Sequence, residues 1–163
     1  MIQLDAIEKI RNRAVQEDMR TDNSARWGCP DLAAKVSREL VDAVELEVGF
    51  ALWEEHRQVL MEVANGGFGP GDGLLGLPGG RLDDEGRSLT DVRKLLFSED
   101  GFQQQKLFPI CDWGCGIWSC VDCGTGEMLK CDEMGIKKLG IQFGTWLEKW
   151  ASGANLWLEI EAA

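Results

Sequence analysis

Residues 65–80, NGGFGPGDGLLGLPGG, decide how the middle of this 163-residue chain must fold. Eight of these sixteen residues are glycine and two are proline. Such a stretch predicts a tight connection, because glycine adopts backbone conformations that other residues avoid. It also contains GDGLLG, Gly71 to Gly76, which has the G-x-G-x-x-G spacing of a dinucleotide-binding loop.

The surrounding sequence argues against a nucleotide on this loop. A dinucleotide loop follows a strand and opens a helix whose N-terminus holds the pyrophosphate. Here a predicted helix precedes the loop, and GLPGG, residues 76–80, cannot propagate a helix after it. Asp72 and the acidic run 83–85 would repel phosphate, and no Walker A motif occurs. We therefore expect a connection that is pinned to the core by Phe68, Leu74, Leu75 and Leu77.

Three helices are predicted before the loop from hydrophobic spacing, over residues 2–19, 32–47 and 52–64. Residues 21–31, TDNSARWGCPD, are expected to form a loop between the first two. Gly49 is expected to end the second helix and Asn65-Gly66-Gly67 the third. The residues expected to face the core are Ile2, Ala6, Ile7, Ile10, Ala14, Val15, Ala33, Val36, Leu40, Val44, Leu52, Val59, Leu60 and Val63.

Strands are predicted only after the loop. Ser88 to Asp91 resembles a capping box that begins a short helix, and strand-forming residues start at Leu107–Ile110. Residues 115–123 and 127–131 predict a hairpin closed at Gly124-Thr125-Gly126. A last helix is expected over residues 139–151, with Leu139, Phe143, Trp146, Leu147 and Trp150 on one stripe, and the tail NLWLEIEAA is left unassigned. Helices first and a hairpin later indicate a single α+β domain over residues 1–163.

Net charge and hydropathy limit the classes of function that the chain can have. Lys and Arg number 17 against 28 Asp and Glu, which gives a net charge of −11 and no basic stretch. Direct binding of nucleic acid is therefore not expected, since phosphate backbones need a positive surface. The apolar runs are too short to span a membrane, and the first residues do not resemble a secretory signal, so a cytoplasmic protein is expected. Acidity favours basic partners, although it can also serve solubility alone.

The cysteines raise the possibility of a metal site. Cys115, Cys120 and Cys123 have the spacing of plant-type iron–sulfur ferredoxins, and Cys120 with Cys123 resembles half of a zinc knuckle. Cys111 and Cys115 are the available second half for zinc. If residues 115–123 form one continuous strand, Cys115 and Cys123 share one face and Cys120 lies on the other. The preferred interpretation is buried, reduced cysteines with no cofactor, and a zinc site on Cys111, Cys115, Cys120 and Cys123 remains the alternative.

No catalytic constellation is evident in the sequence. His56 is the only histidine, and it is expected to lie at the surface or half-buried. No nucleophile motif accompanies it, so an enzyme is not expected, although a pocket of His56 with converging carboxylates would revive that hypothesis. An exposed tryptophan among Trp27, Trp53, Trp113 and Trp157 would indicate a binding surface.

Two segments together resemble the SUKH superfamily of Smi/Knr-type proteins, in a bacterial branch. They are VANGGFGPGDGLLGLPGG, residues 63–80, and LFPICDWGCGIWSCVDCGTGE, residues 107–127. The likeness spans about residues 35–153, which makes the helix at 2–19 peripheral. The residues that match the family's turns and are expected to shape the fold are Asn65, Gly66, Gly67, Gly69, Pro70, Gly71, Trp113 and Gly114.

This resemblance implies a central, mostly antiparallel sheet flanked by helices and a protein-binding module. Many bacterial members of the superfamily are immunity proteins that neutralise a toxin, often a nuclease, whereas fungal relatives act through regulatory protein contacts. We therefore expect an immunity protein that covers a basic toxin groove with an acidic surface. A housekeeping scaffold or regulatory protein is the alternative within the same class. The candidate contact residues are Asp72, Asp83, Asp84, Glu85, Asp112 and Asp122.

Overall fold

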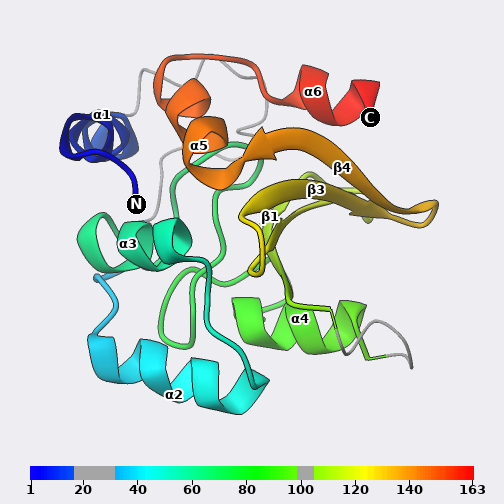
Figure 1. The fold of residues 1–163 in the computed structure, drawn as a ribbon, viewed down its shortest axis with the longest axis horizontal. Coiled ribbons are helices and arrows are strands. Elements are labelled where there is room, and N and C mark those ends of the chain that lie inside the picture. The colour runs from blue at the N-terminus through cyan, green and yellow to red at the C-terminus, as the bar shows by residue number, and fades with distance from the viewer. Residues whose placement is uncertain (17–31, 99–104) are drawn as a thin grey trace.

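The structure, a computed structural model, describes residues 1–16, 32–98 and 105–163. Four strands form one antiparallel sheet, with helices packed around it (Figure 1), which confirms the predicted α+β class. The predicted loop 21–31, which includes Trp27, lies outside the described residues. The helices are α1 (Leu4–Val15), α2 (Arg38–Val48), α3 (Glu54–Glu62), α4 (Leu89–Leu96), α5 (Phe143–Ala151) and α6 (Trp157–Ala162). The strands are β1 (Leu107–Asp112), β2 (Trp118–Asp122), β3 (Glu127–Asp132) and β4 (Gly135–Gln142).

The sheet is a simple meander in the order β1-β2-β3-β4. The hairpin predicted around Gly124-Thr125-Gly126 is present, because β2 pairs with β3 across that turn. Its first strand is shorter than expected, since β2 begins at Trp118 and Cys115 lies in the preceding turn with a φ of 54°. Residues Trp118 to Val121 are all buried, so β2 is covered on both faces.

The first three helices occupy their predicted places with different bounds. The second begins at Arg38, not at residue 32, because the Ser37 side chain accepts a hydrogen bond from the Leu40 N–H and caps it there. Gly49 ends it with a φ of 83°, as predicted. The side of this helix that faces the core also differs from the prediction. Val41 is fully buried, whereas Leu40 is only half-buried. Val15 was expected to face inward and is instead exposed at the end of α1.

The last predicted helix begins later than expected. Residues 135–142 form the edge strand β4, and the helix starts only at Phe143. Leu139 therefore belongs to the strand, whereas Phe143, Trp146, Leu147 and Trp150 form the buried stripe of α5 as predicted. Part of the unassigned tail forms α6, whose side chain Ile160 is fully buried.

The glycine-rich segment 65–80 crosses β1, as expected for a tight connection. Leu74 forms an antiparallel bridge with Cys111, and the Leu75 N–H donates to the carbonyl of Ile110 at 2.9 Å. Gly71 sits at the crossing with a φ of 61°, where a β-carbon would lie 2.5 Å from the Asp112 carbonyl oxygen. The close approach of two backbones therefore requires glycine at this position.

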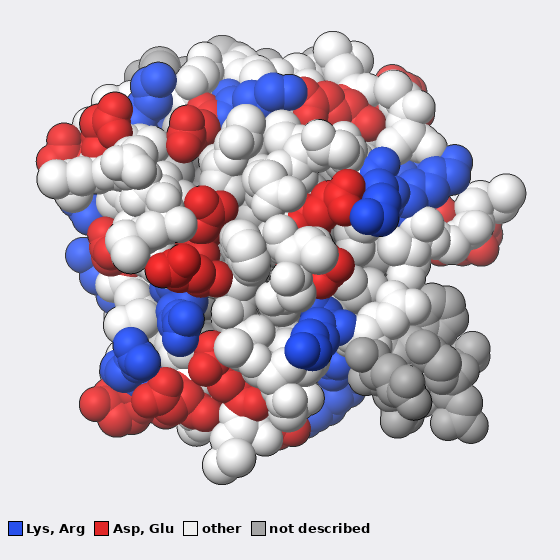
Figure 2. Space-filling model, in the orientation of Figure 1, with Lys and Arg blue, Asp and Glu red and all other residues white. Residues whose placement is uncertain are grey.

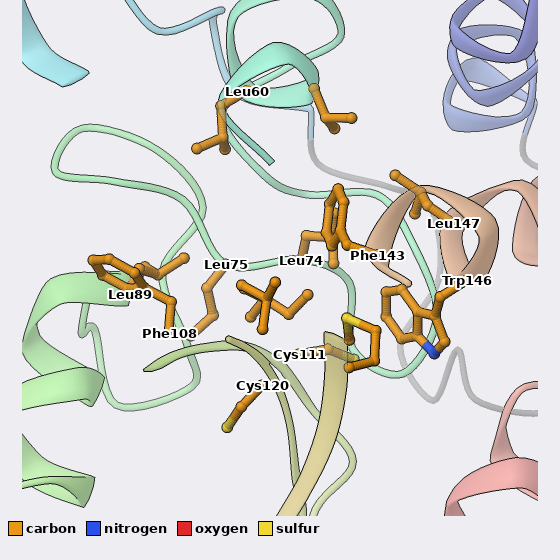
Figure 3. Close-up of a cluster of buried hydrophobic side chains, with 14 of the residues drawn as sticks. Leu60, Leu74, Leu75, Leu89, Phe108, Cys111, Cys120, Phe143, Trp146 and Leu147 are labelled. Atoms are coloured by element: carbon orange, nitrogen blue, oxygen red, sulfur yellow. The ribbon is translucent and has the colours of Figure 1, made fainter. Parts of the chain in front are cut away.

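One hydrophobic core joins this segment to the sheet and helices (Figure 3). Buried side chains from two helices converge with Leu74 above β1. They are Leu60 of α3 and Phe143, Trp146 and Leu147 of α5. The other residues expected to pin the loop, Phe68, Leu75 and Leu77, are also buried. Among the described residues, no helix has the length and apolar character needed to cross a membrane.

Candidate functional site

The two segments that carry the sequence motifs form one structural unit. Beyond the Leu74–Cys111 bridge, the Cys111 thiol donates to the Pro70 carbonyl at 3.1 Å, and the Asp72 N–H donates to the Asp112 carbonyl at 3.2 Å. The segment 65–80 thus places Asp72 against the end of β1, beside Asp112. The site is consequently fixed by backbone contacts between two distant parts of the chain.

Asn65 organises the glycine-rich segment from inside. Its buried side chain accepts a hydrogen bond from the Leu77 N–H at 2.8 Å and donates to the Leu77 carbonyl at 3.2 Å. Its own carbonyl accepts from the Arg81 N–H at 2.9 Å. Gly66, Gly67 and Gly69 all have positive φ, so the turn predicted at these positions is confirmed. Asn65 therefore sets the point at which the acidic loop 81–87 leaves the core.

Trp113 and Gly114 shape the other side of the site. The Trp113 indole donates to the Ser119 hydroxyl at 2.8 Å, and its ring packs against Trp157 of α6. The Gly114 N–H donates to an Asp112 carboxylate oxygen at 2.8 Å, which orients that carboxylate. Both residues thus hold the β1–β2 turn.

Four of the six predicted contact acids line one narrow hollow. We call this surface the acidic hollow; its acidic members are Asp72, Asp83, Asp84 and Asp112, and it also includes Gly73, Leu75, Arg81 and Leu82. A wider groove of about 440 Å³ adjoins it and shares Arg81, Leu82, Asp83 and Asp84. The structure therefore brings together acids that are up to forty residues apart in the sequence.

Asp83 is the structural member of the acidic hollow. One carboxylate oxygen accepts the N–H groups of Glu85 and Arg87, at 3.0 and 2.8 Å, and the other accepts the Arg87 guanidinium at 2.7 Å. Its side chain is only 3% exposed. Asp83 therefore holds the turn 83–87 in place, while Asp84 is exposed at the surface.

The electrostatics of the acidic hollow act most clearly on Asp112. Burial raises the pKa of the Asp112 carboxyl above its ordinary range, and the neighbouring charges of Asp83 and Asp84 raise it further. The Gly114 N–H and the Arg87 guanidinium oppose this rise in pKa. The hollow has a volume of only about 10 Å³, too small to enclose a side chain, so a cationic group could approach these carboxylates only from the outer surface, where it would relieve their mutual repulsion.

Two of the predicted acids lie outside the acidic hollow. Glu85 is exposed beside it and forms an ion pair with Arg87 at 2.8 Å. Asp122 lies at the far end of β2, where its carboxylate accepts the Gly124 N–H at 2.7 Å and stabilises the β2–β3 turn. We therefore assign Asp122 a structural place and not one in the hollow. Sequence reasoning missed Arg81 and Leu82, although both directly follow the glycine-rich segment.

The four cysteines of the zinc alternative are not gathered at one point. Cys111 and Cys120 point to opposite faces of the sheet (Figure 3), and Cys115 is exposed in the β1–β2 turn. The Cys120 thiol instead hydrogen-bonds with that of Cys131, and burial raises the Cys120 pKa well above its ordinary value. Burial likewise raises the pKa of Cys123 to about 12. Among the described residues, no group of three or more His, Cys, Asp or Glu side chains is placed to hold a metal ion.

The expected position of His56 was wrong. It is fully buried, its ring lies 5.4 Å from that of Phe143, and burial lowers its pKa to about 4. The side of α3 that carries His56 packs toward α5, so this polar residue occupies a core position and is neutral at pH 7. The acidic hollow does not include His56. The three described tryptophans in question do not form an exposed surface, since Trp113 is buried and Trp53 and Trp157 are half-buried.

No protein-family model matches the chain, and no curated protein is similar to it in sequence.

Proposed function

We propose that this protein is a non-enzymatic binding module whose acidic hollow docks onto a basic surface of a partner protein. The observation that carries the proposal is the convergence of Asp72, Asp83, Asp84 and Asp112 at one hollow, next to a wider groove. Arg81 and Arg87 lie beside these four carboxylates and offset part of their charge. An excess of negative charge remains, which matches the net charge of −11 of the whole chain.

The fixed geometry of the site favours docking of a partner. Asp72 and Asp112 are held through main-chain contacts of the crossing, and Asp83 is fixed by three hydrogen bonds within its own loop. A pre-ordered surface loses little conformational entropy when a partner binds, which favours affinity. The carboxylates have no nucleophile or histidine among them, so the hollow offers charge and shape.

The likeness to the SUKH superfamily is the basis for proposing which kind of partner the acidic hollow binds. The two segments that carry the likeness, residues 63–80 and 107–127, supply Asp72 and Asp112 of the acidic hollow, and the loop that follows the first segment supplies Asp83 and Asp84. We propose on this basis an immunity protein that occludes the substrate groove of a nuclease-type toxin. Such grooves are basic because they bind phosphate backbones, so an acidic hollow is complementary to them. A housekeeping partner with a similar basic surface would use the same residues.

A titration with an arginine peptide tests whether the acidic hollow is the docking surface. Hexa-arginine is added to ¹⁵N-labelled protein at low salt, and backbone amide shifts are followed. The largest shifts are expected at Gly73, Leu82 and Asp84, and they should shrink at high salt as the charges are screened. Shifts of equal size on the acids of α1 and α2 would contradict the proposed location.

Two variants with equal charge sharpen that titration. One replaces three acids of the hollow by their amides, Asp72→Asn, Asp84→Asn and Asp112→Asn, and leaves the structural Asp83 intact. The control removes three exposed charges elsewhere, Asp5→Asn, Glu8→Gln and Glu161→Gln. Both variants have the same net charge, but only the first lacks the acids of the hollow. Only the first is therefore expected to lose the localised shifts. Equal loss in both would mean that the peptide responds to total charge alone.

A further inference from the structure

Two thiols lie in contact on one face of the sheet. Cys120 of β2 and Cys131 of β3 are free cysteines, and a hydrogen bond joins their side chains. The pairing of the strands explains this contact, because Cys131 lies opposite Trp118, two residues along β2 from Cys120 and on the same face. Figure 3 shows Cys120 pointing away from the core cluster around Leu74. The acidic hollow uses neither thiol.

One of these two thiols can be reached from the surface. A groove of about 420 Å³ lies between the end of α4 and the hairpin formed by β3 and β4, and Cys131 lines it together with Phe97 and Trp118. Cys131 is 7% exposed, whereas Cys120 is fully buried and does not line the groove. A small reagent in the groove would therefore meet Cys131 first, with Cys120 in contact with it on the buried side.

The charge of the molecule favours a neutral oxidant over an anionic one. Asp132 and Glu133 line the groove, although Lys130 offsets the charge of Asp132 at 3.3 Å. The whole chain has a net charge of −11, and Figure 2 shows acidic side chains in several separate places on the face that it draws. An anionic disulfide such as oxidised glutathione would be repelled at long range, whereas hydrogen peroxide is uncharged and small.

Burial distinguishes the two thiols chemically. It raises the pKa of Cys120 well above its ordinary value, so this thiol stays protonated at neutral pH and is a poor first nucleophile. Cys131 lies nearer to the surface and fits the thiol that reacts first. Cys120 then fits the second, resolving thiol, which redox-sensitive cysteines commonly have beside them.

We propose that Cys131 and Cys120 form a peroxide-sensitive thiol pair that closes to a disulfide between β2 and β3. In the first step the Cys131 thiolate attacks one oxygen of hydrogen peroxide. The S–O bond forms, the O–O bond breaks, and the leaving hydroxide takes up the thiol proton to become water. In the second step the Cys120 sulfur attacks the sulfur of the Cys131 sulfenic acid. The S–S bond forms, the S–O bond breaks, and the second water leaves with the Cys120 proton. The two thiols have then given two electrons to the peroxide, and no further oxidant is needed.

The register of the strands makes this disulfide easy to reduce. Cys120 lies opposite Leu129 and Cys131 opposite Trp118, so the two cysteines are diagonal neighbours. The α-carbons of diagonal neighbours are about 7–8 Å apart. Disulfides usually join α-carbons about 4.4–6.8 Å apart, so β2 and β3 must move toward one another locally when the bond forms. A strained disulfide is more reducible, and we therefore expect a reversible switch at the floor of the groove.

Peptide mapping without reduction tests the pair directly. Trypsin cuts after Lys130, so the two cysteines fall in separate peptides, residues 107–130 and 131–137. The folded protein is treated with hydrogen peroxide at low protein concentration, the remaining thiols are blocked, and the monomer is digested. We expect these two peptides to be joined by a disulfide. Treatment of the oxidised protein with dithiothreitol should separate them again.

Single variants identify the partner of Cys131, because the peptide 107–130 contains four cysteines. Cys131→Ser and Cys120→Ala should both lose the linked peptides. Cys115→Ser and Cys123→Ser are matched controls, since each removes a cysteine of the same peptide and leaves the proposed pair intact. Both controls should give the linked peptides at the level of the wild type. Fragmentation of the linked wild-type peptides locates the bond independently of any variant.

Three results would overturn the proposal. One is the absence of linked peptides in the wild type under conditions that fully oxidise the exposed Cys115. Another is a link that persists in Cys120→Ala, because Cys131 would then pair with a different cysteine. The third is a link found only between two copies of the chain. Circular dichroism establishes that each variant is folded before the comparison, and none of these results bears on docking at the acidic hollow.

Discussion

Replacing Gly71 by alanine should destabilise the protein at the crossing of the glycine-rich segment over β1. Two separate costs are involved. The φ of Gly71 is 61°, a left-handed conformation that costs alanine about 1–2 kcal/mol. The added methyl group would also lie 2.5 Å from the Asp112 carbonyl oxygen and 2.7 Å from the Cys111 sulfur. Both neighbours are part of β1, so neither can move without disturbing the sheet.

Gly86→Ala separates these two costs. Gly86 has a similar φ of 76°, but no heavy atom lies within 4 Å of the position that a β-carbon would take there. It should therefore show the conformational cost alone. Overpacking of a well-packed site costs about 1–3 kcal/mol, so Gly71→Ala should lower the free energy of unfolding by about 2–5 kcal/mol in total. For a chain of this size that corresponds to a fall in Tm of roughly 5–15 °C.

Urea unfolding followed by circular dichroism measures the difference between the two variants. Gly71→Ala is expected to be less stable than Gly86→Ala by about 1–3 kcal/mol, with an unchanged dependence on urea. If the two variants were equally stable, the crossing would not be tightly packed at Gly71. The proposed fixed geometry of Asp72 and Asp112 would then lose its structural basis.

Three further changes are expected to have measurable effects. Asn65→Ala leaves the buried Leu77 N–H unpaired, although the Leu77 carbonyl keeps its hydrogen bond from the Gly80 N–H, and should cost about 1–3 kcal/mol in urea unfolding, whereas the exposed Asn12→Ala should cost almost nothing. Ser88→Ala removes the capping box with Asp91 and should cost about 1 kcal/mol, measured in the same way. The pKa of His56 is lowered from 6.5 to about 4 in the folded protein, so only the unfolded chain takes up that proton between these values. Stability should fall by about 3 kcal/mol as the pH drops from 6.5 to 4, and thermal unfolding of His56→Leu should show a fall smaller by that amount.

The sequence predicts the middle of the fold well because glycine and proline act locally. The end of α2 at Gly49 and the capping box at Ser88 depend on neighbouring residues alone, and the positive φ angles of Gly66 and Gly67 follow from the freedom of glycine. The meeting of Asp72 with Asp112 depends on a long-range crossing, which no local pattern specifies. The two acids could be named as candidates from the sequence, but their shared hollow could not be derived.

The errors have a common physical origin in tertiary context. Leu139 fits the apolar stripe of a helix, but residues 135–142 pair with β3 and become a strand. His56 is polar, yet the face of α3 that carries it is covered by Phe143 of α5. Cys120 lies in contact with Cys131, a residue that spacing within 111–123 could not include. In each case packing against a distant element outweighs the local pattern.

Affinity capture from a native cell lysate tests the central claim most directly, namely that the acidic hollow binds a basic protein. The bait proteins are the wild type, the variant with Asp72, Asp84 and Asp112 changed to Asn, and the control with Asp5, Glu8 and Glu161 changed to their amides. One basic partner is expected with the wild type and the control, and its recovery should fall about tenfold or more with the hollow variant and at high salt. Recovery of the same partner with all three baits, regardless of salt, would contradict docking at the acidic hollow.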